Sequence, residues 1–284
     1  MELEETKSEM RGSCNANLIC LTGKQPTLYT MIPLDLSGKI ALVTGASSDL
    51  GKVMAAVLAQ SGADVAIHYH NRRERAEKVG QEIAQLGRRF CLVTGDITVA
   101  SSIAAMKETV VRELGAPDII VTNANNGNPW KTVLEQSVEN YEGQFRSCVL
   151  QNVLMAQAFV PAMIEKKWGR VIAISTECVM QVLPIQSTYV AAKKGMDGLL
   201  RILAKEVGMH GITVNQVAPG WTISERDRLA GSEKQEHYDQ HVPLRRRGED
   251  KEIAHAVAFL ASDLASFITG VYLPVCGGNV MPSV

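Results

Sequence analysis

Short apolar runs alternate with longer segments of mixed polarity along most of the chain. The runs have apolar centres and end at Gly or at polar residues, which predicts buried strands at 39–45, 63–69, 89–96, 117–123, 169–176, 212–219 and 270–275. The segments between them place apolar residues at helical spacing, which predicts helices at 51–62, 71–87, 100–114, 141–167, 189–207 and 249–262.

Strands that alternate with helices, and that are apolar throughout, predict a parallel sheet covered on both faces. No break in composition divides the pattern, so we expect one doubly wound Rossmann-like α/β domain over residues 35–284. Residues 1–34 show no clear period and are interpreted as an N-terminal extension, with its flexibility left open.

Composition narrows the classes of function. The chain has 284 residues, 46% of them hydrophobic, and a net charge of −1, so no strong field favours nucleic acid or an anionic membrane. Six cysteines without metal-type pairing suggest a reducing compartment, and the acidic, polar N-terminus does not resemble a targeting signal. No apolar run is expected to reach the ~18 residues of a membrane span. We therefore expect a cytoplasmic protein with no nucleic-acid or membrane partner.

The first strand is followed by TGASSDLG at residues 44–51. In this position Gly45 permits a tight turn and Gly51 lets the next helix approach the sheet, while the amides at the helix start favour an anion. A carboxylate at Asp49 is unexpected beside a phosphate. Two interpretations remain: Asp49 caps the helix, or it weakens a nucleotide site.

Tyr189 and Lys193 are four residues apart in a predicted helix and so lie on one face, one turn apart. An ammonium group beside a phenol favours the phenolate, so we expect Lys193 to lower the pKa of Tyr189 and to make it a proton donor and acceptor for a carbonyl/alcohol pair. The predicted strand that ends at Thr176 lies thirteen residues before Tyr189, which places a hydroxyl at the same end of the sheet.

Taken together, these motifs resemble the short-chain dehydrogenase/reductase family, in particular its 3-oxoacyl-carrier-protein-reductase-like branch. The resemblance extends from residue 34 to the end of the chain. It rests on LSGKIALVTGASSDLG, GDIT, GRVIAIST, TYVAAKKGM, GITVNQVAPGW, EIAHAVAFLAS and ITGVYLPVCGG in this order. It implies a single Rossmann-like domain with about seven parallel strands.

The resemblance also implies roles for individual residues. Tyr189 would be the general acid/base, Lys193 would assist it, and Thr176 would stand where the family usually has Ser. No metal site is implied, and His237 and His241, whose spacing could bind a metal, are interpreted as solvated lid residues. The expected cofactor-binding residues are Gly45, Ser47, Ser48, Asp49, Leu50, Gly51, Tyr69, His70, Asn71, Arg72, Asp96, Ile97, Asn123, Ala124, Tyr189, Lys193, Pro219, Gly220, Thr222 and Ser224.

The chain departs from the family pattern at Asp49, Asn125, Cys148 and Cys276. The family has an Asn at the position of Cys148, where it holds a water of the proton relay. Three interpretations remain for this position: an impaired relay, a relay rerouted through Asn152 one turn further on, or a small buried residue that only fills space.

The end of the second predicted strand favours NADP(H) over NAD(H). An acidic residue there would bind the ribose 2′-hydroxyl of NAD, but the chain has Tyr69, followed by His70, Asn71, Arg72 and Arg73. These residues suit a 2′-phosphate.

The leading functional hypothesis is an NADPH-dependent reductase of a ketone or other small carbonyl substrate. The alternatives are an NAD-dependent alcohol or polyol dehydrogenase and a catalytically weak binding or regulatory protein on the same fold. The resemblance also implies a homodimer or homotetramer.

Overall fold

The computed structural model describes residues 33–127 and 129–282, and the predicted extension 1–34 lies almost entirely outside them. The strands are β1 (Ile40–Val43), β2 (Asp64–Tyr69), β3 (Phe90–Thr94), β4 (Ile119–Thr122), β5 (Gly169–Ile174), β6 (Ile212–Pro219), β7 (Thr222–Ile223), β8 (Gly248–Glu249) and β9 (Tyr272–Val275). The α-helices are α1 (Asp49–Gln60), α2 (Arg73–Gln85), α3 (Ala100–Glu113), α4 (Val138–Phe145), α5 (Gln151–Lys166), α6 (Cys178–Gln181), α7 (Ser187–Val207), α8 (Glu225–Ala230), α9 (Glu236–His241) and α10 (Asp250–Ala261).

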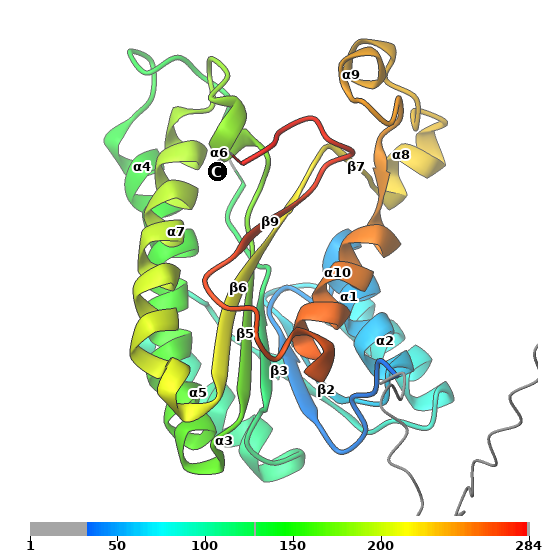
Figure 1. Cartoon of the computed structure of the whole chain (residues 1–284), viewed down its shortest axis with the longest axis vertical. Coiled ribbons are helices and arrows are strands. Elements are labelled where there is room, and N and C mark those ends of the chain that lie inside the picture. The colour runs from blue at the N-terminus through cyan, green and yellow to red at the C-terminus, as the bar shows by residue number, and fades with distance from the viewer. Residues whose placement is uncertain (1–32, 128, 283–284) are drawn as a thin grey trace, which may run out of the picture. The chain divides into compact units, whose positions relative to one another are not determined.

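The main sheet has seven parallel strands in the order β3-β2-β1-β4-β5-β6-β9. Helices α1, α2 and α10 cover one face and α3, α5 and α7 cover the other, as Figure 1 shows. A separate apolar layer fills each side. The predicted doubly wound Rossmann-like fold is therefore confirmed, and the order reverses between β1 and β4, where such sheets bind ligands beyond the carboxyl ends of the strands.

The central strands are buried along their whole length, which explains why they could be predicted. All six residues of β5 and all eight of β6 are buried. Buried parallel strands are mostly apolar on both faces, so they stand out as mainly apolar runs. The buried polar exceptions are Arg170 in β5 and Thr213, Asn215 and Gln216 in β6.

The long predicted helix is one continuous segment with a π-helical turn, η1 (Arg146–Leu150), between α4 and α5. Its 29 residues, Val138–Lys166, are long and apolar enough to span a membrane by length and composition alone, so the expectation that no segment reaches this length is wrong. Half of the apolar window is buried inside the structure, and α5 packs against α3 and α7. We interpret it as a core helix of the domain, because core helices can be as long and as apolar as membrane-spanning ones.

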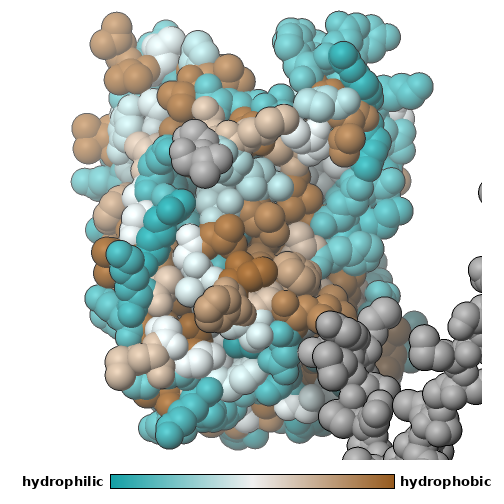
Figure 2. Space-filling view, viewed as in Figure 1, coloured by the Kyte–Doolittle hydropathy of each residue, from teal (hydrophilic) through white to brown (hydrophobic). Residues whose placement is uncertain are grey.

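The segment that carries α8 and α9 lies at the top right of Figure 1, beside β7 and β8. We call residues 222–245 the lid. In Figure 2 this region is mostly hydrophilic, whereas hydrophobic residues gather around β9 at the centre of the face. The side chain of Arg247 is fully buried beneath the lid and forms an ion pair with Asp227 at 2.8 Å. It also donates hydrogen bonds to the carbonyl oxygens of Trp221, Thr222, Ser232 and Glu233.

Candidate active site

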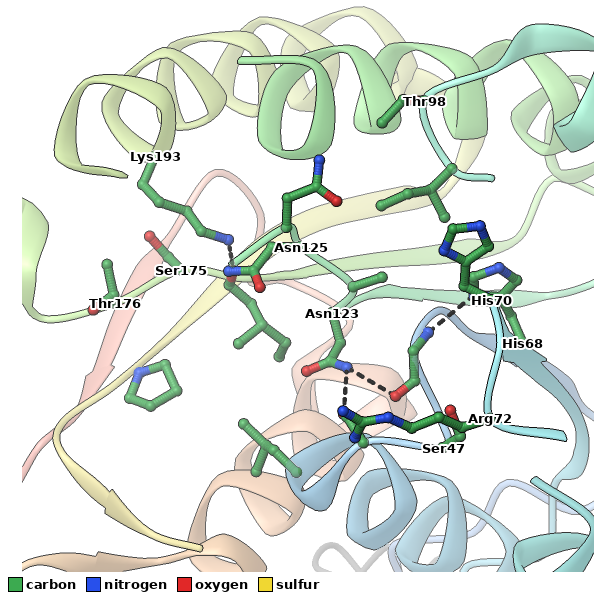
Figure 3. Close-up of a pocket in the computed structure, with 18 of the residues that line it drawn as sticks. Ser47, His68, His70, Arg72, Thr98, Asn123, Asn125, Ser175, Thr176 and Lys193 are labelled. Atoms are coloured by element: carbon green, nitrogen blue, oxygen red, sulfur yellow. Dashed lines mark hydrogen bonds between the residues drawn. The ribbon is translucent and has the colours of Figure 1, made fainter. Parts of the chain in front are cut away.

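A cleft of about 570 Å³ lies at the carboxyl ends of the central strands. Figure 3 shows Lys193 and Thr176 towards one end of it, His70 and Arg72 towards the other, and Asn123 between them. The residues expected to bind a cofactor that do line this cleft are Gly45, Ser47, Ser48, Leu50, His70, Asn71, Arg72, Asp96, Ile97, Asn123, Ala124, Tyr189, Lys193, Pro219, Gly220 and Thr222.

Four of the expected residues do not line the cleft: Asp49, Gly51, Tyr69 and Ser224. Tyr69 is buried at the end of β2 and is only 7% exposed. Ser224 caps α8, since its hydroxyl accepts a hydrogen bond from the Asp227 amide. Gly51 acts indirectly, through the turn described next.

The turn between β1 and α1 depends on two glycines. Gly45 has φ of +65°, a left-handed conformation that favours glycine. A Cβ atom on Gly51 would lie 2.1 Å from the carbonyl oxygen of Gly45. Only glycine at residue 51 therefore lets the start of α1 approach the turn, and this approach forms the concave surface on which a phosphate can rest.

The position of Asp49 answers the question raised by the sequence. The N-cap of α1 is Ser48, whose hydroxyl accepts a hydrogen bond from the Gly51 amide at 3.1 Å, so the expectation that Asp49 caps the helix is wrong. Asp49 is the first helical residue, and its carboxylate pairs with Arg75 of α2 at 2.7 Å. Arg75 also contacts Glu225 at 2.8 Å, and Glu225 contacts Lys52. The carboxylate is thus balanced by a cation and lies outside the cleft lining, where it opposes a phosphate least.

His68 also positions this turn, a role that the sequence pattern did not predict. The side chain is almost completely buried on β2. Its Nδ1 accepts a hydrogen bond from the Gly45 amide and its Nε2 lies against the carbonyl oxygen of Gly95, both at 3.0 Å. This pattern requires the neutral tautomer with the proton on Nε2. Burial lowers the pKa of His68, which also favours the neutral ring.

Asn123 and Ala124 connect the end of β4 to the turn. The Asn123 side-chain amide donates to the carbonyl oxygen of Thr44 at 3.0 Å and to that of Gly45 at 3.3 Å. The Ala124 amide donates to the Thr44 hydroxyl at 3.1 Å. These two residues, which match the family pattern, therefore position the cleft, while Asn125 adds a side chain to its lining.

The structure brings Thr176, Tyr189 and Lys193 together at the inner end of the cleft. Lys193 is buried, and its Nζ donates to the carbonyl oxygen of Ile174 at 2.7 Å. The same Nζ lies 5.8 Å from the centroid of the Tyr189 ring. The ammonium group is thus fixed by the backbone of β5 and does not contact the phenol ring closely.

The pKa of Tyr189 is shifted in the direction opposite to the expected one. Burial raises it, and a hydrogen bond with Thr176 acts in the lowering direction without reversing the shift. Burial also lowers the pKa of Lys193. In this state the phenol is therefore firmly protonated, which suits a proton donor to a developing alkoxide.

The environment of Cys148 favours the space-filling interpretation. Cys148 lies in the π-helical turn, is 1% exposed, and its thiol lies 3.8 Å from the side-chain oxygen of Gln144. The side chain of Asn152 is already used, because it accepts from the Thr122 hydroxyl and donates to the Cys148 carbonyl, both at 2.7 Å. Neither residue lines the cleft, so a relay rerouted through Asn152 has no support in this geometry.

A second cavity, of about 950 Å³, meets the cleft at Thr176 and Tyr189. It is bordered by the loop after β4, the segment after β5, the loop after β6 and the lid. His237 and His241 of the lid line it with ring centroids 4.7 Å apart, and the described residues contain no cluster of three or more potential metal ligands. Thr176 and Tyr189 therefore lie between two spaces, the cleft that contains the glycine turn and the second cavity beside the lid.

The residues of the elongated cleft fit a nicotinamide dinucleotide. The backbone of Gly45 lies so close to that of Gly51 that a side chain on Gly51 would fill the space between them. The concave surface that this close approach forms can hold a phosphate group. Asp96 is held at the other end by hydrogen bonds from the amide and hydroxyl of Thr98, at 2.8 and 2.7 Å. The buried Ser175 hydroxyl, which also lines the cleft, has no protein partner among the described residues.

The chain is similar to known reductases and dehydrogenases. Residues 45–279 match the family model described as Enoyl-(Acyl carrier protein) reductase. The chain is 36% identical to the 3-oxoacyl-(acyl-carrier-protein) reductase FabG of Staphylococcus aureus, over 86% of this chain and 98% of that protein. It is 35% identical to the L-rhamnose 1-dehydrogenase (NAD(P)(+)) of a Sphingomonas species, over 86% and 96%.

Among solved structures, the chain resembles the promiscuous reductase LugOII, which catalyses keto-reduction at C1 during lugdunomycin biosynthesis. The TM-score is 0.80 with 30% identity, over 87% of this chain and 99% of that one.

Proposed function

Because the chain belongs to the short-chain dehydrogenase/reductase family and is an NAD(P)-dependent oxidoreductase acting on CH–OH or C=O groups, we propose that it reduces a ketone to a secondary alcohol with NADPH. The observation that carries the proposal is the position of Tyr189, which lies where the cleft and the second cavity meet. Burial raises its pKa and so favours the protonated phenol. The interpretation as a non-catalytic binding protein is set aside, since the family's acid/base residues are present and assembled.

The chain's own residues account for the proton side of the reaction. When bound in the cleft, the nicotinamide would supply a hydride to the carbonyl carbon. The Thr176 hydroxyl would donate a hydrogen bond to the carbonyl oxygen, and Tyr189 would pass its phenolic proton to that oxygen as charge develops. Lys193, fixed by the Ile174 carbonyl, would place a positive charge near the phenolate that remains.

The preference for NADPH rests on the residues after β2. Tyr69 is not acidic, and Arg72 lines the cleft with no carboxylate partner among the described residues. Arg73, in contrast, pairs with Glu77 at 2.8 Å and does not line the cleft. Arg72 is therefore positioned to bind a 2′-phosphate in the cleft. Arg73, which pairs with Glu77, serves as the matched control.

We expect Arg72→Ala to weaken NADPH binding about tenfold and to leave NADH binding unchanged, because a charge-assisted hydrogen bond to phosphate is lost. Arg73→Ala should change neither. Direct titration of both cofactors into the wild type and the two variants measures this. Equal binding of NADPH and NADH by the wild type would contradict the cofactor choice.

The experiment that tests the reaction is a screen of ketones with the cofactor that binds more tightly. Consumption of NADPH with at least one ketone, and formation of the matching secondary alcohol, is the expected result. A wild-type protein that binds NADPH and consumes none across a broad ketone panel would contradict the proposal.

A second candidate is favoured by one comparison. The similarity to an L-rhamnose 1-dehydrogenase supports oxidation of a sugar or polyol with NAD(P)⁺. The same residues would then work in reverse, with Tyr189 accepting a proton. Burial raises the pKa of Tyr189, and reduction uses the protonated phenol whereas oxidation uses the phenolate, so we place reduction first.

We further propose a homo-oligomer in the cytoplasm. The hydrophobic residues around the edge strand β9, together with the fully exposed Phe267, support contact between subunits.

A further inference from the structure

The second cavity contains a buried carboxylate beside the acid/base residues. Glu177 directly follows Thr176, lines the cavity and is only 4% exposed. The Tyr238 hydroxyl of α9 lies 2.9 and 3.1 Å from its two oxygens, and the Asn279 side chain donates to one of them at 3.0 Å. Its polar partners are therefore all neutral.

No cation balances this carboxylate. In the described part of the chain, Glu177 has no Lys, Arg or His within ion-pair distance. Burial raises the pKa of Glu177, and the hydrogen bonds from Asn279 and Tyr238 oppose that shift. A buried carboxylate is usually paired with a cation, because removing its charge from water is costly. Glu177 lines the cavity, so a cation that enters this cavity could reach it.

Four Trp and Tyr side chains line the cavity: Trp130, Tyr189, Trp221 and Tyr238. Trp221 and Tyr238 meet edge to face with centroids 5.6 Å apart, and Trp130 meets Tyr189 in the same way at 6.1 Å. Both tryptophans are about half exposed, at 52% for Trp130 and 48% for Trp221. Aromatic faces attract cations, and Arg247 already lies over the Trp221 ring at 4.7 Å. A carboxylate combined with half-exposed aromatic rings is the chemistry that binds an alkylammonium group.

We propose that the ketone substrate of this site carries a cationic ammonium group, which binds to Glu177 beside these aromatic side chains while the carbonyl lies at Thr176 and Tyr189. This inference rests on the proposed ketone reductase function and names its substrate class. An ammonium group would supply the charge that Glu177 lacks, and its position beside Thr176 would orient the carbonyl. The same carboxylate would disfavour anionic substrates.

The experiment uses two aryl ketones of matched shape. One carries a para trimethylammoniomethyl group, and the other carries the neutral neopentyl group. We expect kcat/KM to be about tenfold higher for the cation in the wild-type enzyme. Glu177→Gln, which removes the charge and keeps the shape, should remove most of this preference, and the loss of kcat/KM should be larger for the cationic ketone than for the neutral one.

Tyr238→Phe is the matched control. It removes the lid's hydrogen bond to Glu177 and keeps the charge, so the preference for the cation should persist. If Tyr238→Phe abolishes the preference as fully as Glu177→Gln does, then Glu177 acts by anchoring α9, and the inference is overturned.

Binding of the two corresponding alcohols, measured by calorimetry, gives a readout without turnover. Tighter binding of the cationic alcohol by the wild type, lost in Glu177→Gln, supports the inference. Turnover of both ketones with equal kcat/KM overturns it and leaves the reductase function standing. Preferential binding of the cationic alcohol, with no NADPH consumed on any ketone, contradicts the reductase function and keeps the cation site.

Discussion

Replacing Tyr189 with phenylalanine is expected to lower kcat for ketone reduction by about 10³-fold. In the proposed mechanism the phenol donates the proton; Tyr189 lines both the cleft and the second cavity, and Phe has the same shape without the hydroxyl. NADPH affinity and the folded structure should remain close to wild type, because the ring still fills its site. Steady-state rates and cofactor titration measure these two effects separately.

Tyr141→Phe is the control for this change. The Tyr141 hydroxyl lies 2.9 Å from Ser187 and lines neither the cleft nor the second cavity, so its loss should leave kcat unchanged. A Tyr189→Phe variant that keeps most of the wild-type rate would show that another group donates the proton.

The raised pKa of Tyr189 also predicts the pH dependence. A phenol whose pKa is raised stays protonated throughout the neutral range and loses its proton only as the pH rises towards the raised value. The reduction rate should therefore be flat from about pH 6 to pH 8 and fall only in strongly alkaline solution.

The second large effect is expected at Gly51. Because a Cβ at this position would lie 2.1 Å from the carbonyl oxygen of Gly45, Gly51→Ala must displace the backbone of the turn. We expect NADPH affinity to fall about 100-fold and the free energy of unfolding to fall by ~2 kcal/mol. Calorimetry with NADPH and denaturant unfolding measure the two quantities.

Gly198→Ala provides the matched control, since Gly198 lies in α7 with nothing within 4 Å of the added Cβ. This variant should bind NADPH like the wild type and be slightly more stable, because alanine favours a helix. If Gly51→Ala binds NADPH as tightly as Gly198→Ala does, the glycine turn does not form the phosphate cradle.

The parts of this fold that could be predicted from sequence are those determined by apolar burial. The segments that form β5 and β6 are mainly apolar because both faces of a central parallel strand are covered. The lid helices α8 and α9 could not be predicted because none of their described residues is buried. That segment is held by the polar contacts of Arg247, which the hydrophobic pattern of the sequence does not reveal.

The candidate site divides in the same way. Tyr189, Lys193 and Thr176 could be predicted because their spacing is a local property of a helix and a strand end. The roles of His68 and Glu177 depend on partners far away in the chain, Gly95 in one case and Tyr238 and Asn279 in the other. Asp49 shows the same limit, since only the folded structure brings Arg75 of α2 to its carboxylate.

Transfer of deuterium from NADPH to the ketone carbon tests the proposed hydride transfer most directly. The wild-type protein is incubated with NADPH that carries deuterium on the transferable position of the nicotinamide, together with a ketone that it consumes. Mass spectrometry of the alcohol should show one deuterium bound to the carbinol carbon, and no labelled alcohol should form with Tyr189→Phe in the same time. Alcohol that forms without deuterium on that carbon would contradict this mechanism.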